Sequence, residues 1–89
     1  MIKIIKAEYI GEKKIRLLFS DQSWGEYDLQ PLIDWQTELV IPLQDAHYFS
    51  DFFLELGALC WKNGFELSAG SLNRKLKEQG KLHTHQQAA

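Results

Sequence analysis

The chain has 89 residues, of which 45% are hydrophobic and 12% aromatic, and this composition predicts one folded domain with no room for a second core. Ten Lys and Arg against twelve Asp and Glu give a net charge of −2, which removes the general attraction on which most nucleic-acid-binding proteins depend. The single cysteine excludes an internal disulfide, and neither a secretory signal nor a membrane-spanning apolar run is visible. These features predict a cytoplasmic protein without membrane contact.

Alternation of apolar and polar residues predicts three strands within the first thirty residues. The first spans residues 2–9 and slips out of phase at Ile4-Ile5, which is typical of a β-bulge. The second spans 14–19, and one of its faces carries bulky apolar residues, namely Ile15, Leu17 and Phe19. The third spans 23–29. Because the connections at Gly11-Glu12 and at 20–22 are short, we expect a three-stranded antiparallel meander.

The central part of the chain has weaker patterns. Pro31 ends the third strand because it has no N–H to donate, and Asp28 is expected to cap a single helical turn after it. Residues 34–44 have no sustained period, so we expect a loop with a short extended piece. Asp45 is a good N-cap residue and predicts a short helical turn through Phe49.

The stretch after this turn predicts a β-hairpin, with strands at 52–56 and 59–61 joined at Gly57. The hairpin and the meander could form one five-stranded sheet or two layers. Trp61 is expected at the last position of its strand, as an anchor between sheet and helix, although it could instead line a binding surface. Asn63 and Gly64 follow as a turn, since both tolerate positive φ.

A C-terminal amphipathic helix completes the predicted fold. Ser68 is its expected N-cap, Leu72 and Leu76 share one face, and Gly80 suits the position just after its end. The fold class is therefore α+β, with one domain at residues 1–80 and a flexible tail at 81–89.

Residue types that could carry chemistry do not form a recognisable motif. His83 and His85 could chelate a divalent metal, but a solvated tail is the favoured interpretation because two ligands do not complete a site. Cys60 could act as a nucleophile with His47 as its base, yet it lies in a short apolar strand where a free cysteine is usually an inert hydrophobe. We therefore predict no enzymatic activity, no catalytic residue, no metal and no cofactor.

Four basic residues lie on or beside the predicted last helix: Arg74, Lys75, Lys77 and Lys81. They could contact phosphates of a nucleic acid, or they could be the solvated back of an amphipathic helix that also complements its C-terminal dipole. The solvated interpretation is favoured, since no second helix is predicted that would complete a helix-turn-helix.

Several segments resemble, in order and spacing, the domain-of-unknown-function family 2442, a family of small bacterial proteins: Phe19-Ser20-Asp21, Asp28-Leu29-Gln30-Pro31-Leu32, Leu43-Gln44-Asp45 with Phe49, and Trp61-Lys62-Asn63-Gly64 with Leu67 and Leu72. The resemblance covers about residues 2–76, and Trp-x-Asn-Gly is its most specific part. The chain departs from the family pattern at Gln22, Glu66 and Ala69-Gly70, which are turn and cap positions.

The resemblance implies no catalytic residues, and it implies a component of a small module of the toxin–antitoxin kind. The chain also has aromatic residues beyond the obvious needs of its core: Trp24, Trp35 and Tyr48. We therefore predict a non-enzymatic interaction module that binds a protein partner or associates with itself as a dimer, in one version as the neutralising partner of a toxin–antitoxin-like pair. The alternative is a nucleic-acid-binding regulator that uses the basic helix.

Overall fold

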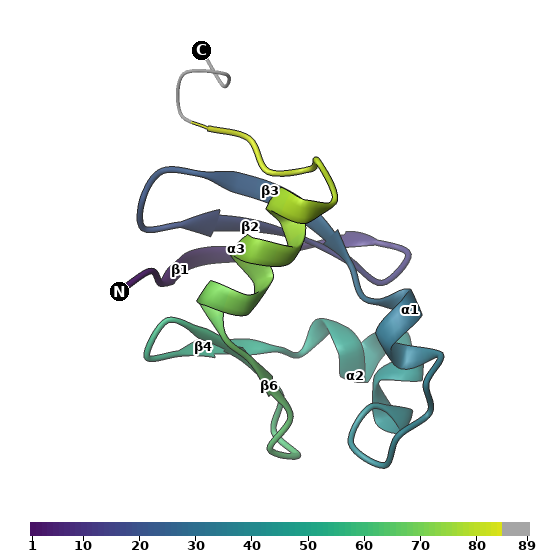
Figure 1. Ribbon diagram of the computed structural model, residues 1–89. Coiled ribbons are helices and arrows are strands. Elements are labelled where there is room, and N and C mark those ends of the chain that lie inside the picture. Colours follow the sequence, from purple (N-terminus) through teal and green to yellow (C-terminus); the bar gives the residue numbers. More distant parts are fainter. Residues whose placement is uncertain (85–89) are drawn as a thin grey trace.

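The N-terminal third of the chain forms the predicted meander. In the computed structural model, which describes residues 1–84, three antiparallel strands pair in the order β1 (Ile4–Gly11), β2 (Lys14–Phe19) and β3 (Trp24–Asp28) (Figure 1). The register of β1 on β2 shifts between Ile4 and Lys6, so the predicted bulge is confirmed. Glu12 and Lys13 form the tight turn, with φ values of 55° and 62°. Positive φ at both turn residues matches the twist of a two-residue hairpin.

A second three-stranded sheet follows, in the order β4 (Phe53–Glu55), β5 (Ala58–Cys60) and β6 (Glu66–Leu67). It contains the predicted hairpin, which turns at Leu56-Gly57. The strands therefore form two sheets, and these meet where the Ile4 N–H donates to the Gly57 carbonyl at 2.9 Å. The sequence did not predict β6, because two residues have no measurable period; the strand exists only because it pairs with β5.

Three short helices connect the sheets: α1 (Gln30–Ile33), the 3₁₀ helix η1 (Ile41–Gln44) and α2 (Ala46–Ser50). The prediction of a short extended piece within residues 34–44 is wrong, because residues 41–44 form η1. Pro42 stands in the first turn of η1, where its fixed φ suits a helix and its missing N–H costs nothing. The turn buries Leu43 against the core. The predicted cap of the next helix is confirmed, because Asp45 Oδ2 accepts from the Tyr48 N–H at 2.9 Å.

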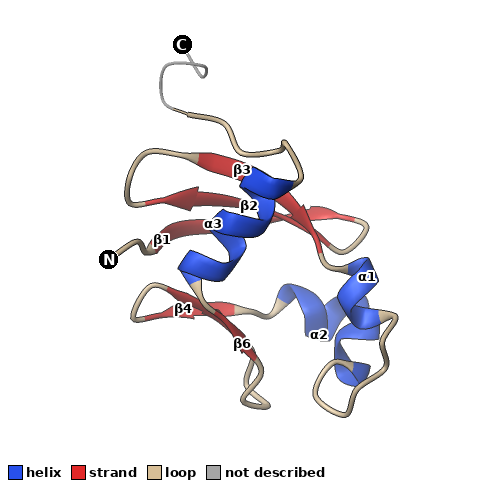
Figure 2. Ribbon diagram, in the orientation of Figure 1, coloured by secondary structure: helices blue, strands red, loops and turns tan. Residues whose placement is uncertain are grey.

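The helix α3 (Ala69–Glu78) lies across the strands of both sheets (Figure 2). Its predicted N-cap is confirmed, since Ser68 Oγ accepts from the Ser71 N–H at 3.1 Å. It buries Leu72 and Leu76, and Gly80, with φ of 71°, allows the chain to leave the helix in a left-handed conformation. No helix within residues 1–84 has the length and apolar character needed to cross a membrane.

Ordered contacts continue past residue 80, where the sequence predicted the domain to end. The Trp24 N–H donates to the His83 carbonyl at 2.9 Å, and the His83 N–H donates to the Trp24 carbonyl at 2.8 Å. Their rings stack with centroids 4.3 Å apart. Residues 81–83 therefore lie against the edge of β3. Residues 85–89 of the predicted tail, including His85, lie outside the described residues.

Trp61 is part of the core, with 2% of its surface exposed, although β5 ends one residue before it. Its indole Nε1–H donates to the Phe49 carbonyl at 2.9 Å and so ties α2 to the second sheet. Asn63 Nδ2 donates to the Leu39 carbonyl at 3.0 Å. Gly64, at φ of 95°, closes the turn. The Trp-x-Asn-Gly element therefore holds the second sheet to the segment between α1 and α2.

Candidate functional site

The three aromatic residues predicted for an interaction surface lie in three separate places. Trp24 stacks on His83 at the edge of β3. Tyr48 lies on α2, where the Lys62 ammonium is 5.3 Å from its ring centroid. Trp35, directly after α1, is 76% exposed. The structure does not join them into one patch, and Trp35 is the only one of the three that has most of its surface exposed to solvent.

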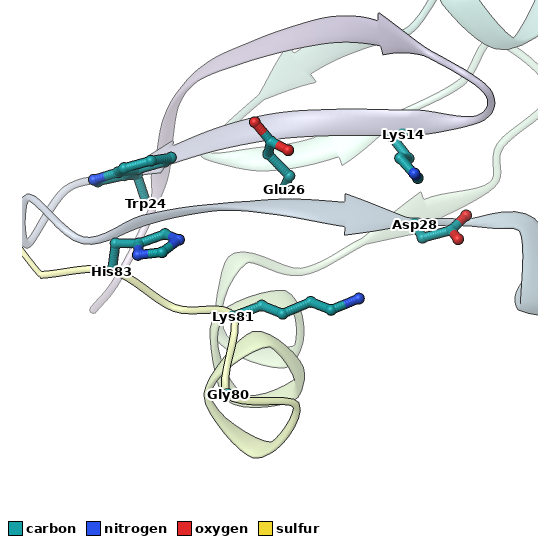
Figure 3. Close-up of a pocket in the computed structure, with 7 residues that line it drawn as sticks. All are labelled: Lys14, Trp24, Glu26, Asp28, Gly80, Lys81 and His83. Carbon is teal, nitrogen blue, oxygen red and sulfur yellow. The ribbon is translucent and has the colours of Figure 1, made fainter. Parts of the chain in front are cut away.

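Trp24 lines a shallow hollow of about 350 Å³ beside β3 (Figure 3). The charges around this hollow have both signs, with two lysines and two carboxylates: Lys14, Lys81, Glu26 and Asp28. Within residues 1–84, no three His, Cys, Asp or Glu side chains come together as a metal site. The hollow therefore favours no single ligand chemistry.

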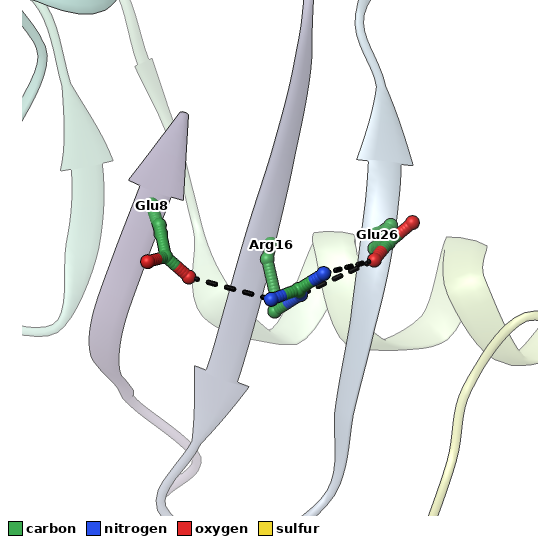
Figure 4. A network of polar contacts seen from close by, with 3 residues as sticks. All are labelled: Glu8, Arg16 and Glu26. Atoms are coloured by element: carbon green, nitrogen blue, oxygen red, sulfur yellow. Dashed lines mark hydrogen bonds and ion pairs between the residues drawn. The ribbon is translucent and has the colours of Figure 1, made fainter. Parts of the chain in front are cut away.

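The outer face of the first sheet is occupied by an ion-pair row (Figure 4). Arg16 lies between two carboxylates, with Glu26 Oε2 at 2.7 Å and Glu8 Oε1 at 3.6 Å. Hydrogen bonding to Glu26 raises the pKa of Arg16 above its usual value. The pairs are exposed and stabilise the sheet weakly.

Lys75 faces away from Lys77 in the predicted basic cluster. At about 100° per residue, Lys75 and Lys77 point about 160° apart around α3. Lys75 lines a groove beside α1, whereas Lys81 lines the hollow beside β3. Arg74 lies about 60° from Lys77 around the helix, so these two cations remain close together, and the nucleic-acid interpretation stays a prediction.

Cys60 is buried and is an unsuitable nucleophile. Burial raises the pKa of its thiol, and the carboxylates of Glu66 and Glu55 raise it further. A thiolate is therefore disfavoured at neutral pH. His47 lies on the exposed surface of α2, and no hydrogen bond joins it to Cys60 within the part of the chain that the structure describes.

The strongest candidate site is a groove of about 280 Å³ between α1 and α3. We call it the α1–α3 groove. One wall is apolar and consists of Pro31, Leu32 and Trp35. The opposite wall is one flank of α3, formed by Ser71, Leu72, Lys75 and Gln79. Tyr27 from β3 and Leu67 from β6 complete the lining. Concave, mainly apolar sites with a few polar groups are the usual form of a binding site.

Sequence reasoning identified Trp35 and Lys75 but did not place them together. It missed Tyr27 as a groove residue, because a tyrosine on the inner face of a strand is usually interpreted as a core residue. It also missed Ser71 and Gln79, although a signal was present: Ser71, Lys75 and Gln79 are four residues apart and therefore share one flank of a helix.

Comparisons of the chain with protein-family models, with curated proteins and with solved structures find no match.

Proposed function

We propose that this protein is a non-enzymatic module that binds a segment of a protein partner in the α1–α3 groove. The observation that carries the proposal is Trp35, which is 76% exposed on the apolar wall of that groove. Tryptophan is enriched among the residues that dominate binding energy at protein interfaces. An exposed apolar side chain of this size beside a groove marks a candidate contact for a protein partner.

Trp35 can supply a large part of the energy of binding. Covering its indole would bury roughly 150–200 Å², which corresponds to about 4–5 kcal/mol before the cost of association. Two further apolar side chains, Leu39 and Ile41, are exposed on the segment that follows Trp35.

The neutralising role in a toxin–antitoxin-like pair is the narrower form of this proposal. It is supported by the resemblance to family 2442 described above and by the small, acidic chain. The proposed setting is the cytoplasm, in keeping with a single cysteine that is buried and unpaired.

The test begins with affinity capture of the tagged protein from its host, followed by calorimetry with the purified captured partner. Trp35→Ala should weaken binding about 30-fold or more, because loss of a central aromatic anchor costs about 2 kcal/mol or more. Leu56→Ala is the matched control, since Leu56 is an exposed apolar residue at the tip of the β4–β5 hairpin. Equal affinities of wild type and Trp35→Ala for that partner would show that the groove does not bind it.

A further inference from the structure

The two walls of the α1–α3 groove differ in chemistry. Pro31, Leu32 and Trp35 present only carbon and one indole N–H, whereas α3 presents polar side chains at every fourth residue, namely Ser71, Lys75 and Gln79. Lys75 is the only charged residue among those that line the groove. Within residues 1–84 its ammonium group takes part in no ion pair. An unneutralised cation beside an apolar wall selects for negative charge in whatever lies between them.

Tyr27 supplies an independent indication of a ligand. Only 8% of its surface is exposed, and its hydroxyl has no hydrogen-bond partner in the part of the chain that is described. No fully buried side-chain nitrogen or oxygen in that part lacks a partner, so the Tyr27 hydroxyl must retain some contact with solvent. Tyr27 is one of the residues that line the α1–α3 groove.

The Tyr27 hydroxyl keeps its proton and is able to donate. Burial raises the pKa of this phenol, and the Asp28 carboxylate raises it further, so the group is protonated at neutral pH. A buried hydroxyl is normally hydrogen-bonded, and one that opens into a groove is available to an acceptor on a ligand. The groove thus holds two donors without protein acceptors, one charged and one neutral.

We propose that the α1–α3 groove selects a partner segment in which a carboxylate, from Asp, Glu or a chain terminus, is adjacent to a bulky apolar side chain. The apolar side chain packs on Leu32 and Trp35, and the carboxylate accepts from the Lys75 ammonium. The Tyr27 hydroxyl donates to the same segment at the floor of the groove. This inference rests on the proposed function, because it names the chemistry of the segment that the module binds.

Two carboxylates, Asp34 and Glu78, lie near the groove, and within residues 1–84 neither forms an ion pair with Lys75. Asp34, next to Trp35, already accepts a hydrogen bond from Gln30 Nε2 at 2.7 Å. Glu78 lies about 60° from Lys75 around α3, about 20° beyond Ser71, and its side chain is exposed. A basic segment would place like charge beside Lys75, and a neutral segment would leave the ammonium without an acceptor.

The test uses two tetrapeptide probes of nearly equal shape, acetyl-Leu-Leu-Asp-Leu-amide and acetyl-Leu-Leu-Asn-Leu-amide. Each is titrated into the ¹⁵N-labelled full chain, and the indole N–H signal of Trp35, assigned with Trp35→Phe, reports binding. We expect the Asp peptide to bind about tenfold more tightly than the Asn peptide at low salt, since one charge-assisted hydrogen bond contributes about 1.5 kcal/mol. The difference should shrink as salt screens the charge.

Two lysine variants provide a matched comparison. Lys75→Gln should abolish the preference for the Asp peptide, whereas Lys77→Gln, the same change of charge on the opposite flank of α3, should keep it. Tyr27→Phe should lower the affinity for both peptides and retain the preference for the Asp peptide. The amide spectrum of each variant shows whether it is folded.

The outcomes separate the two proposals. Equal affinity of the two peptides for the wild type, with the Trp35 signal shifting in both titrations, overturns the selection for carboxylate and leaves the groove as a binding site. If Lys75→Gln still prefers the Asp peptide, the proposed selection for carboxylate is also overturned, because another residue then recognises the negative charge. If neither peptide moves the Trp35 signal at millimolar concentration, the groove does not take such segments, and the proposed function fails with the inference.

Discussion

Replacing Trp61 by Phe tests whether the Trp-x-Asn-Gly element holds the two halves of the fold together. The change removes the indole N–H and leaves the Phe49 carbonyl oxygen without its 2.9 Å donor in the core. An unsatisfied buried carbonyl costs about 1–3 kcal/mol. The indole also packs against the rings of Phe49, Phe52 and Phe65, with centroids 5.6–6.1 Å away.

A phenylalanine ring leaves part of this space empty, which costs about 1 kcal/mol. We therefore expect Trp61→Phe to lower the free energy of unfolding by about 2–4 kcal/mol, a large share of the roughly 5–10 kcal/mol of a domain of this size. With a slope of about 1–1.5 kcal/mol per molar urea, the midpoint should fall by roughly 2 M. Far-UV circular dichroism is the suitable readout, because the substitution itself alters tryptophan fluorescence.

The control is Trp35→Phe, the same chemical change at a residue that is 76% exposed. It should alter the free energy of unfolding by no more than about 0.5 kcal/mol. If the two variants lose the same stability with the same slope, the Trp61 hydrogen bond and packing do not anchor the fold, and the reasoning is wrong.

Two further predictions concern the contacts of β3 and the turn before it. Gly25→Ala would place a Cβ 2.8 Å from the Lys81 carbonyl oxygen, so it should lower the free energy of unfolding by about 1–3 kcal/mol. Gly70→Ala, whose Cβ meets nothing closer than 3.9 Å, should be neutral or stabilising by up to about 1 kcal/mol in the same urea titration. A side-chain hydrogen bond from Ser23, then one from its backbone N–H, lower the pKa of Asp21. A lowered folded-state pKa gives stability that is present above the unfolded value of 3.8 and is lost as pH falls through the folded value. Urea midpoints measured from pH 6 to pH 2.5 should therefore decline less steeply in Asp21→Asn than in wild type; parallel declines would contradict this assignment.

The sequence by itself determined the elements whose stability is local. The alternation in 14–19 predicted the strand now seen as β2, because side chains of a strand point to opposite faces in turn. Asp45 and Ser68 predicted the starts of α2 and α3, since a capping side chain bonds to an N–H only three residues away. Gly80 predicted the end of α3 for an equally local reason.

Tertiary structure decided everything that depends on residues distant in the chain. The two-residue β6 forms only because it pairs with β5, and residues 41–44 wind into η1 where Leu43 is buried. His83 is ordered because it meets Trp24, 59 residues earlier in the chain. The α1–α3 groove brings together side chains from β3, the α1 region, β6 and α3. No local period encodes such a meeting, since it follows from how the summed burial of the whole core positions each element.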